Sequence, residues 1–479
     1  MSLSSAASAA GSPTAQHRVH AFGDDALGTD DAVALAERIR SGEVHPKELL
    51  EAAIARANAV DPALAAVATP MYDTPRCDGT ANDPFFGVPI FMKDNMSLVG
   101  VPTGNGSEAY LAKPSTEDAP FTTQVLSTGV TVIGKSRLPE FGLNASTEFM
   151  TLPPVRNPWL TSHSVGASSG GSAALVAAGA VPFAHANDGG GSIRIPAACA
   201  GLVGLKPSRG RHLISPKMKK VPIDIGSEGI VSRTVRDTAT FFCGIEAGYH
   251  NPLLPPIGRI EGPSNRRLRI GLIVDSITGA PDADTVAALH RTATLLESAG
   301  HEIEPIPLPV GDEFAADFLQ YWAFLAHLLI DLGKILVAPD FDKSRADGLG
   351  VGLRNHHRAN LRRTPGAIKR LKRASNTYGE VFSNHDLVIS PTLRHVAPEI
   401  GHLDPNVPFD VLIERLFNYV AYTPLNNITG TPAMSVPAGL SSDGVPIGVQ
   451  LLGAYGDERT LIETAFFLEE AQPFARIFE

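Results

Sequence analysis

Two glycine- and serine-rich stretches stand in the middle of this 479-residue sequence: GASSGGS at residues 166–172 and DGGGSIRIP at residues 188–196. Glycine loses much backbone freedom on folding, so clusters of it need a structural reason. Three consecutive glycines before Ser192 can turn successive backbone N–H groups toward one point, which makes an anion nest or an oxyanion hole. A serine beside such a nest is well placed to attack a carbonyl group. The alternative is a flexible loop without chemistry, and neither stretch alone excludes it.

Three rival motifs match parts of the sequence formally. Residues 129–136 read GVTVIGKS and fit the P-loop pattern, but the Val-Thr-Val-Ile run inside it is typical of a strand. Neither glycine cluster has the spacing and context of a dinucleotide fingerprint. Residues 166–170 fit the nucleophile elbow GxSxG, which requires a later histidine and an acid. Histidines such as His327 and His402 keep that alternative open.

Helical and strand-like periods alternate around the two stretches, which predicts an α/β fold. Helices are expected to begin at Thr29 and at Pro46, the second ending near Asp61-Pro62, and to occupy residues 173–180 and 282–298. Strands are expected at residues 88–92, 130–133, 268–274, 302–306 and 387–390, the last of which ends before Pro391.

Composition excludes several classes of protein. The chain is 43% hydrophobic and 19% charged, which is an ordinary globular balance with material for a large core. A net charge of −10 argues against general nucleic-acid binding. We find no apolar run of ~18 residues, so no transmembrane helix is expected.

The cysteines and the N-terminus bear on the cellular setting. Cys77, Cys199 and Cys243 form neither a disulfide framework nor a CxxC pair, which favours a reducing cytoplasm. The first residues are rich in Ala, Ser and Gly and lack the features of a signal peptide. We interpret residues 1–20 as a disordered tail.

Two further segments have both a structural and a functional interpretation. Residues 353–372 carry many basic side chains, and we interpret them as the solvated face of a helix pair rather than a site for an anionic partner. Residues 314–329 hold five aromatic side chains, which favours a core role. The same segment is the best candidate for an apolar wall near a substrate.

From about Thr29 onward the sequence resembles the amidase signature family, because several motifs occur in the order typical of that family. The matching stretches are GVPIFMKDN at 87–95, GASSGGS at 166–172, DGGGSIRIP at 188–196, GLVGLKP at 201–207, SRTVRD at 232–237, residues 386–392, GTPA at 430–433 and GVPIGVQ at 444–450. The resemblance implies one domain over residues 21–479, with a central mixed β-sheet covered by helices on both faces.

The resemblance also assigns the catalytic roles, for amide hydrolysis through a serine acyl-enzyme without a cofactor or metal. Ser192 is the nucleophile, Ser168 is the bridging serine held by a cis peptide bond, and Lys93 is the base. The oxyanion donors correspond to the backbone N–H groups of Gly189, Gly190 and Gly191, together with that of Ser192.

The physical chemistry agrees with these roles. A serine hydroxyl is a weak nucleophile until a base removes its proton, and Lys93 can be that base only if its pKa falls through burial. Asp188 and Arg194 are expected to brace the turn. Cys199 is expected to be a small buried side chain, and His163 and the pair His356–His357 lack spacing for a metal.

The sequence also departs from the family pattern and leaves other functions open. Asn187 stands where Thr is common, and Gly189 replaces a larger residue. The alternative function is the glutaminase-type subunit of a tRNA-dependent amidotransferase, but Ile195 stands where those subunits usually have Gln. An inactive binding protein is a third hypothesis, which the intact Lys93, Ser168 and Ser192 argue against. We expect a small-molecule amide substrate, no nucleic-acid or membrane partner, and a homodimer.

Overall fold

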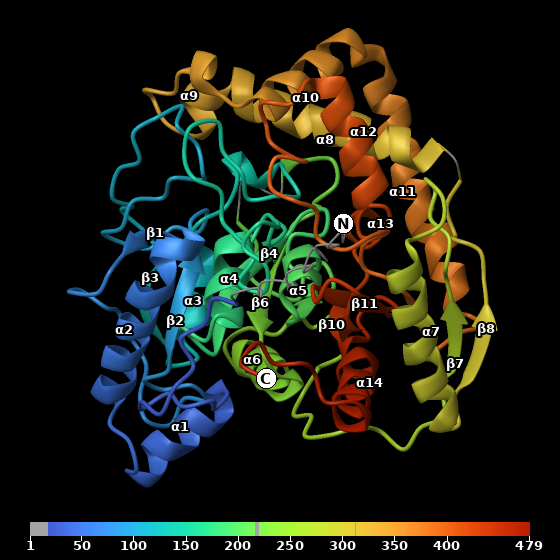
Figure 1. Cartoon of the computed structure of the whole chain (residues 1–479). Coiled ribbons are helices and arrows are strands. Elements are labelled where there is room, and N and C mark those ends of the chain that lie inside the picture. Colours follow the sequence, from blue (N-terminus) through green and yellow to red (C-terminus); the bar gives the residue numbers. More distant parts are fainter. Residues whose placement is uncertain (1–17, 216–219, 312) are drawn as a thin grey trace, which may run out of the picture.

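The computed structural model describes residues 18–215, 220–311 and 313–479 as an α/β fold (Figure 1). Its strands are β1 (Val67–Pro70), β2 (Pro89–Lys93), β3 (Thr131–Ser136), β4 (Phe183–Asp188), β5 (Val203–Lys206), β6 (Ser227–Ser232), β7 (Arg269–Leu272), β8 (Glu302–Pro305), β9 (Leu387–Pro391), β10 (Ala433–Leu440) and β11 (Pro446–Leu452). Its α-helices are α1 (Ala32–Ser41), α2 (Pro46–Leu64), α3 (Pro120–Leu126), α4 (Gly170–Ala177), α5 (Arg194–Ala200), α6 (Val235–Gly248), α7 (Ala283–Ser298), α8 (Glu313–Asp331), α9 (Gly333–Leu336), α10 (Gly348–Ala359), α11 (Thr364–Val381), α12 (Phe409–Tyr419), α13 (Pro424–Thr429) and α14 (Glu458–Ala471). Short 3₁₀ turns are η1 (Glu140–Gly142), η3 (Lys343–Arg345) and η4 (Leu361–Arg363).

The main sheet is mixed and has the strand order β4-β6-β5-β10-β11-β9-β7-β8. The pairs from β4 to β9 are antiparallel, whereas β7 runs parallel to both β9 and β8. A second sheet has the order β1-β3-β2, in which β2 runs parallel to β3. Lys93, the last residue of β2, is thereby placed at the end of a fully buried strand.

Helix α5, which follows Ser192, packs directly on the middle strands of the main sheet. Two glycines allow this close approach. A Cβ atom on Gly204 would lie 2.8 Å from the side chain of Ala197, and one on Gly448 would lie 2.5 Å from that of Ala198. Helices α6, α7 and α14 also pack on the sheet, with α14 in contact with both others. The helix that carries the DGGGSIRIP motif is therefore held tightly by the sheet.

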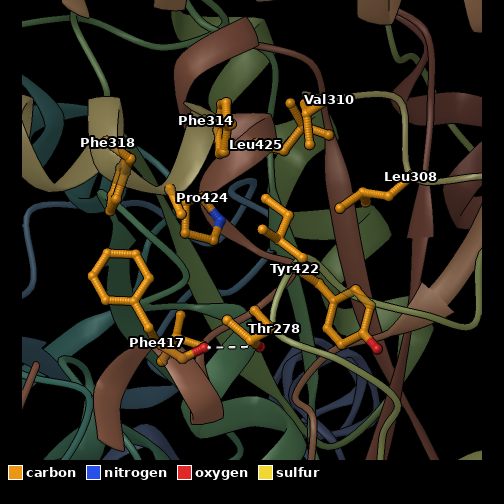
Figure 2. A pocket seen from close by; sticks show the side chains of 13 residues that line it. Thr278, Leu308, Val310, Phe314, Phe318, Phe417, Tyr422, Pro424 and Leu425 are labelled. Atoms are coloured by element: carbon orange, nitrogen blue, oxygen red, sulfur yellow. Dashed lines mark hydrogen bonds between the residues drawn. The ribbon is translucent and has the colours of Figure 1, made fainter. Parts of the chain in front are cut away.

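The C-terminal half supplies a group of helices at one end of the molecule, where α8, α10, α11 and α12 lie together (Figure 1). The basic residues of segment 353–372 lie on α10, η4 and α11, as the sequence suggested, and most are exposed. Arg370 forms ion pairs with Glu313 and Asp317 of α8. Phe314 and Phe318 of the aromatic segment are buried in an apolar cluster with Leu425 of α13 (Figure 2).

The predicted helices and strands form, but most of their boundaries differ; the helix expected to begin at Thr29, for example, begins at Ala32 with Asp31 as its N-cap. Helix α2 begins at Pro46 as predicted, with His45 as its N-cap and Glu48 completing a capping box, but it continues past Pro62 to Leu64. The predicted tail lies mostly outside the described residues. Its last part is attached to the body, since Arg18 donates to Ile477 O at 3.0 Å and Val19 donates to Pro158 O at 2.8 Å.

Candidate active site

Lys93 lies at the centre of the site and is fully buried. Its side-chain nitrogen lies within hydrogen-bond distance of three side-chain oxygens: Ser168 Oγ at 2.8 Å, Ser169 Oγ at 2.9 Å and Asn187 Oδ1 at 2.6 Å. The structure therefore brings together the lysine of β2, the serine pair that precedes α4, and the end of β4.

Burial lowers the pKa of Lys93 to about 7, because the charged form loses its hydration. The carboxylates of Glu228 and Asp188 act in the opposite direction and raise this pKa. No ion pair to Lys93 is found among the described residues. The lysine is thus neutral in a large fraction of molecules near neutral pH, which is the condition for a general base.

Ser168 is buried against Lys93 and follows a cis peptide bond, Ala167–Ser168, as the resemblance implied. Gly142 of η1 also packs against Ser168. A Cβ atom on Gly142 would lie 2.9 Å from Ser168 Oγ, and the residue has a φ of +68°, which disfavours any side chain. The 3₁₀ turn and the serine pair therefore fit together only with glycine at this position.

Ser192 is half-buried in the turn between β4 and α5. Its carbonyl oxygen accepts the N–H of Ser169 at 3.3 Å, which joins this turn to the serine pair. Its hydroxyl makes no hydrogen bond with the described residues, so it is available to a substrate. Ser192 and the Lys93–Ser168 pair consequently lie on adjoining segments of backbone.

A buried ion pair braces the turn that carries Ser192. Asp188 accepts two hydrogen bonds from the Arg194 guanidinium, at 2.9 and 3.0 Å, and one from Asn427 at 2.8 Å. Burial alone would raise the pKa of Asp188, but the charge and hydrogen bonds of Arg194 hold it at about 2. Asp188 and Arg194 thus brace the turn, as expected from the sequence.

The backbone N–H groups of the turn differ in whether they already have an acceptor. The Gly191 N–H donates to Asp188 Oδ1 at 2.7 Å, so this expected oxyanion donor is already engaged. The N–H groups of Gly189, Gly190 and Ser192 donate to no other group within the described part of the chain. These three donors are available to a developing negative charge.

His185 contacts the backbone of Lys93. The sequence alone did not identify it as a site residue. Its Nδ1 accepts the backbone N–H of Lys93 at 3.2 Å, and its Nε2 lies 3.0 Å from Glu228 Oε2. Because Nδ1 accepts, the ring proton is on Nε2 and is donated to Glu228. Burial lowers the pKa of His185, so the ring is neutral. His185 and Asn187 are two positions apart on β4, and the fold brings both into contact with Lys93.

The rival motifs do not form sites of their own. Residues 131–136 of the P-loop match form the buried strand β3. The Ser168 hydroxyl of the elbow match contacts Lys93 rather than a histidine. Cys199 is buried, with its sulfur 3.0 Å from Tyr419 Oη. Among the described residues, no group of three or more His, Cys, Asp or Glu side chains is arranged to hold a metal ion.

Membrane-spanning helices are long and apolar. None of the described helices combines the length and the apolar character that crossing a membrane requires.

Comparisons with known proteins agree with this geometry. The family model described as Amidase matches residues 48–462. A putative amidase AmiC from Mycobacterium leprae is 45% identical over 463 residues, which cover 96% of this chain and 99% of the relative. A 6-aminohexanoate-cyclic-dimer hydrolase from Pseudomonas is 35% identical over 93% of this chain and 95% of its own length.

A solved structure is similar over nearly the whole length. The structure of 6-aminohexanoate cyclic dimer hydrolase complexed with substrate aligns with a TM-score of 0.83 and 30% identity, over 95% of this chain and 99% of the other. This agreement includes the mixed sheet flanked by helices. The chain therefore belongs to the amidase family of amidase signature enzymes and is a hydrolase of carbon–nitrogen bonds in amides.

Proposed function

We propose that the chain hydrolyses amides through an acyl-enzyme on Ser192, with Ser168 and Lys93 as its proton relay. The observation that carries the proposal is the buried contact of 2.8 Å between Lys93 Nζ and Ser168 Oγ, beside a half-buried serine with a free hydroxyl. A lysine with a pKa of about 7 supplies the base that this serine needs.

The hydrogen bonds around Lys93 orient its lone pair. Asn187 Oδ1 can only accept, and the hydroxyl of Ser169 directs its own proton to Asn187 O at 3.3 Å. A neutral amine therefore donates its two N–H groups to Asn187 and Ser169. Its lone pair is left facing the hydroxyl of Ser168, which is the direction in which the relay requires the proton to move.

Acylation then proceeds with a closed proton balance. Ser192 Oγ attacks the amide carbon while its proton passes to Ser168 Oγ, and the Ser168 proton passes to Lys93. The oxyanion is stabilised by the N–H groups of Gly189, Gly190 and Ser192. As the C–N bond breaks, the proton returns through Ser168 to the leaving nitrogen. Water is activated by the same relay, cleaves the ester and restores the Ser192 hydroxyl.

The test is hydrolysis of a panel of aliphatic, aryl and oligomeric amides, with Ser192→Ala as the control. We expect the wild-type chain to release carboxylate and amine, and the variant to lose this activity by a factor of about 10⁴ or more. Acyl-enzyme trapped on Ser192 by rapid acid quench would identify the intermediate. Full activity in Ser192→Ala would refute the assignment.

The cellular setting and partners are part of the proposal. We place the enzyme in the cytoplasm, acting on a small-molecule amide without a nucleic-acid or membrane partner, and as a homodimer. Three free cysteines, one of them exposed, support a reducing compartment. Cell fractionation and light scattering test these points. Co-purification with an amidotransferase partner and charged tRNA would instead favour the glutaminase-subunit alternative.

We further propose that residues 21–479 fold as one domain. One buried apolar cluster contains side chains from Leu27 to Leu468, so both ends of the chain share a core. A single cooperative unfolding transition is expected, and two separated transitions would contradict this assignment.

A further inference from the structure

Two buried carboxyl groups meet close to the relay without a cation between them. Glu140, the first residue of η1, is 4% exposed, and Asp347, the N-cap of α10, is 5% exposed. Their side chains are hydrogen-bonded to each other, and Glu140 Oε2 also accepts the backbone N–H of Asp347 at 2.6 Å. Neither forms an ion pair within the described part of the chain. Two buried carboxylates in contact cannot both stay ionised, so the pair holds one proton near neutral pH.

The surroundings place this proton on Glu140. Asp347 Oδ1 accepts the N–H of Gly350 at 2.7 Å in the first turn of α10, where the helix dipole favours a negative charge. Burial raises the pKa of Glu140, and the charge of Asp347 raises it further. Ser107 donates its hydroxyl proton to Glu140 Oε1 at 2.5 Å. Glu140 therefore donates its own proton to the carboxylate of Asp347.

One connection from this pair to the relay runs through η1. Gly142, at the other end of the turn, lies so close to Ser168 that a Cβ atom on it would be 2.9 Å from the hydroxyl oxygen. The turn is closed by the N–H of Leu143, which donates to Glu140 O at 3.0 Å. A displacement of Glu140 therefore moves the residue that packs on Ser168.

A second connection runs through the loop that carries Ser107. The backbone N–H of Asn105 donates to Asp94 O at 2.9 Å, and the carbonyl of Asn105 accepts the N–H of Phe141 at 2.8 Å. Asp94 follows Lys93 directly in the sequence. The carboxyl pair is thus joined to both members of the buried contact between Lys93 and Ser168.

We propose that Glu140 and Asp347 are positioning residues for the relay, and that the proton between them keeps Ser168 against Lys93. When this proton is lost to solvent at alkaline pH, the second negative charge repels the first and separates η1 from α10. Ser192 then loses its path to the base even though Lys93 is neutral. The inference rests on the relay proposed above, and it adds an alkaline limb to the pH–activity profile.

The other ionisable groups on the surrounding elements keep one charge state at alkaline pH or have partners elsewhere. Burial raises the pKa of Tyr110, in the neighbouring loop, to about 12. Asp404, in the segment that packs on the start of α10, accepts hydrogen bonds from Asn406. Burial lowers the pKa of His356 and His357 of α10, so both are neutral. The nearby cations face other carboxylates: Lys135 faces Asp94, Arg345 faces Asp342, and Lys343, Arg354 and Arg358 face Asp331.

The rate at which a fluorophosphonate labels Ser192 measures the relay without the choice of a substrate. In the wild type this rate should rise with pH as Lys93 becomes neutral, and then fall by about tenfold per pH unit once the pair has lost its proton. Glu140→Gln and Asp347→Asn each leave a neutral amide that can donate to the remaining carboxyl group. Neither variant can hold two negative charges in the pair, so both should keep a high rate up to about pH 10.

Asp237→Asn is the matched control. Asp237 of α6 is another buried carboxyl group, and burial and the charge of Asp31 raise its pKa, but it accepts the N–H groups of Ala32 and Val33 at the start of α1. Because it does not contact the relay, its replacement should leave the alkaline limb of labelling as in the wild type. Circular dichroism verifies that each variant is folded, and either variant of the pair is sufficient for the test.

Thermal melts across pH give a readout that does not require activity. The pKa of Glu140 is raised in the folded chain, so the folded state binds this proton more tightly than the unfolded state. The wild type should therefore lose stability as pH rises from the ordinary pKa of a glutamate to the raised one. Glu140→Gln should lose less stability over the same range.

The outcomes separate this inference from the proposed function. An alkaline limb that is unchanged in Glu140→Gln and Asp347→Asn overturns the positioning role, and so does a wild type that is labelled at its full rate throughout the alkaline range. In both cases labelling confined to Ser192 leaves the proposed function standing. If Ser192 is not labelled at any pH, the proposed function is wrong and the positioning role is wrong with it.

Discussion

The backbone N–H of Lys93 donates to Nδ1 of His185 at 3.2 Å, and the same imidazole ring donates through Nε2 to Glu228. The lysine is therefore held at both ends, by a neutral histidine at its backbone and by three oxygens at its side chain. The carboxylate of Glu228, which is hydrogen-bonded to this histidine, raises the pKa of Lys93. His185 therefore both holds the backbone of Lys93 in place and contacts the carboxylate that raises the pKa of this lysine.

The acid limb of the pH–activity profile should report Lys93. The base works only when neutral, so kcat/KM should fall as pH drops through about 7, with the greater activity on the alkaline side. An optimum below pH 6 would contradict a lysine base.

Glu228→Gln should move this limb to lower pH. The Glu228 carboxylate raises the pKa of Lys93, while a glutamine can still accept the His185 N–H without carrying charge. A shift of about half a pH unit or more is expected. Asp224→Asn removes a charge of the same sign near Glu228 and is the control, because Asp224 is not among the groups that shift the pKa of Lys93. Equal pH–activity profiles in the wild type and in Glu228→Gln would exclude an electrostatic effect of Glu228 on Lys93.

Asn187→Leu should lower kcat by about 10- to 100-fold, because it removes the acceptor that orients one N–H of neutral Lys93. Asn187→Asp keeps an acceptor but adds a negative charge, so it should raise the pKa of Lys93 and move the acid limb to higher pH. Steady-state kinetics across pH distinguish the two effects. If both variants behave alike, the orientation of the lone pair does not depend on Asn187.

Gly142→Ala should reduce kcat by about 100-fold while the chain stays folded. The added methyl group would meet Ser168 Oγ at 2.9 Å in a backbone conformation that disfavours side chains. Gly444→Ala is a matched control, since its φ is also positive at +75° but a Cβ atom there has open space. Circular dichroism and thermal melts verify folding, and similar activities of the two variants would rule out the contact.

Asp188→Asn should destabilise the fold by about 3–5 kcal/mol, because Arg194 would remain buried and charged without its partner. Urea unfolding monitored by fluorescence measures the change. Glu261→Gln breaks an exposed pair with Arg259 and should leave stability unchanged. An equal effect of both substitutions would show that the buried pair has no special role.

The sequence predicted the parts of the site that depend on motifs. Lys93 and Ser168 were assigned through the family resemblance of two separate stretches and lie in contact, and the strand expected at residues 130–133, which weakened the P-loop match, lies largely in β3. The start of α2 at Pro46 followed from local signals, whereas the helix expected to begin at Thr29 begins at Ala32. The helix start and the strand are local features that periodicity and capping are sufficient to predict, whereas the roles of Lys93 and Ser168 came from the resemblance.

Other features arise only from long-range packing. His185 looks like an ordinary residue of an apolar strand until β2 comes to lie beside β4. The engagement of the Gly191 N–H by Asp188 is set by backbone dihedral angles that residue types do not specify. The contact between Glu140 and Asp347 joins two segments that no sequence spacing connects. The parallel placement of β7 between β8 and β9 likewise follows from the sheet as a whole.

The most direct test of a nucleophilic Ser192 activated by Lys93 is labelling by a fluorophosphonate, followed by peptide mass spectrometry, in wild type, Ser192→Ala and Lys93→Met. The account predicts one adduct on Ser192 in the wild type, none in Ser192→Ala, and labelling slowed by about 100-fold or more in Lys93→Met. An adduct on Ser168 or Ser169, or labelling of Ser192 at the wild-type rate without Lys93, would contradict it.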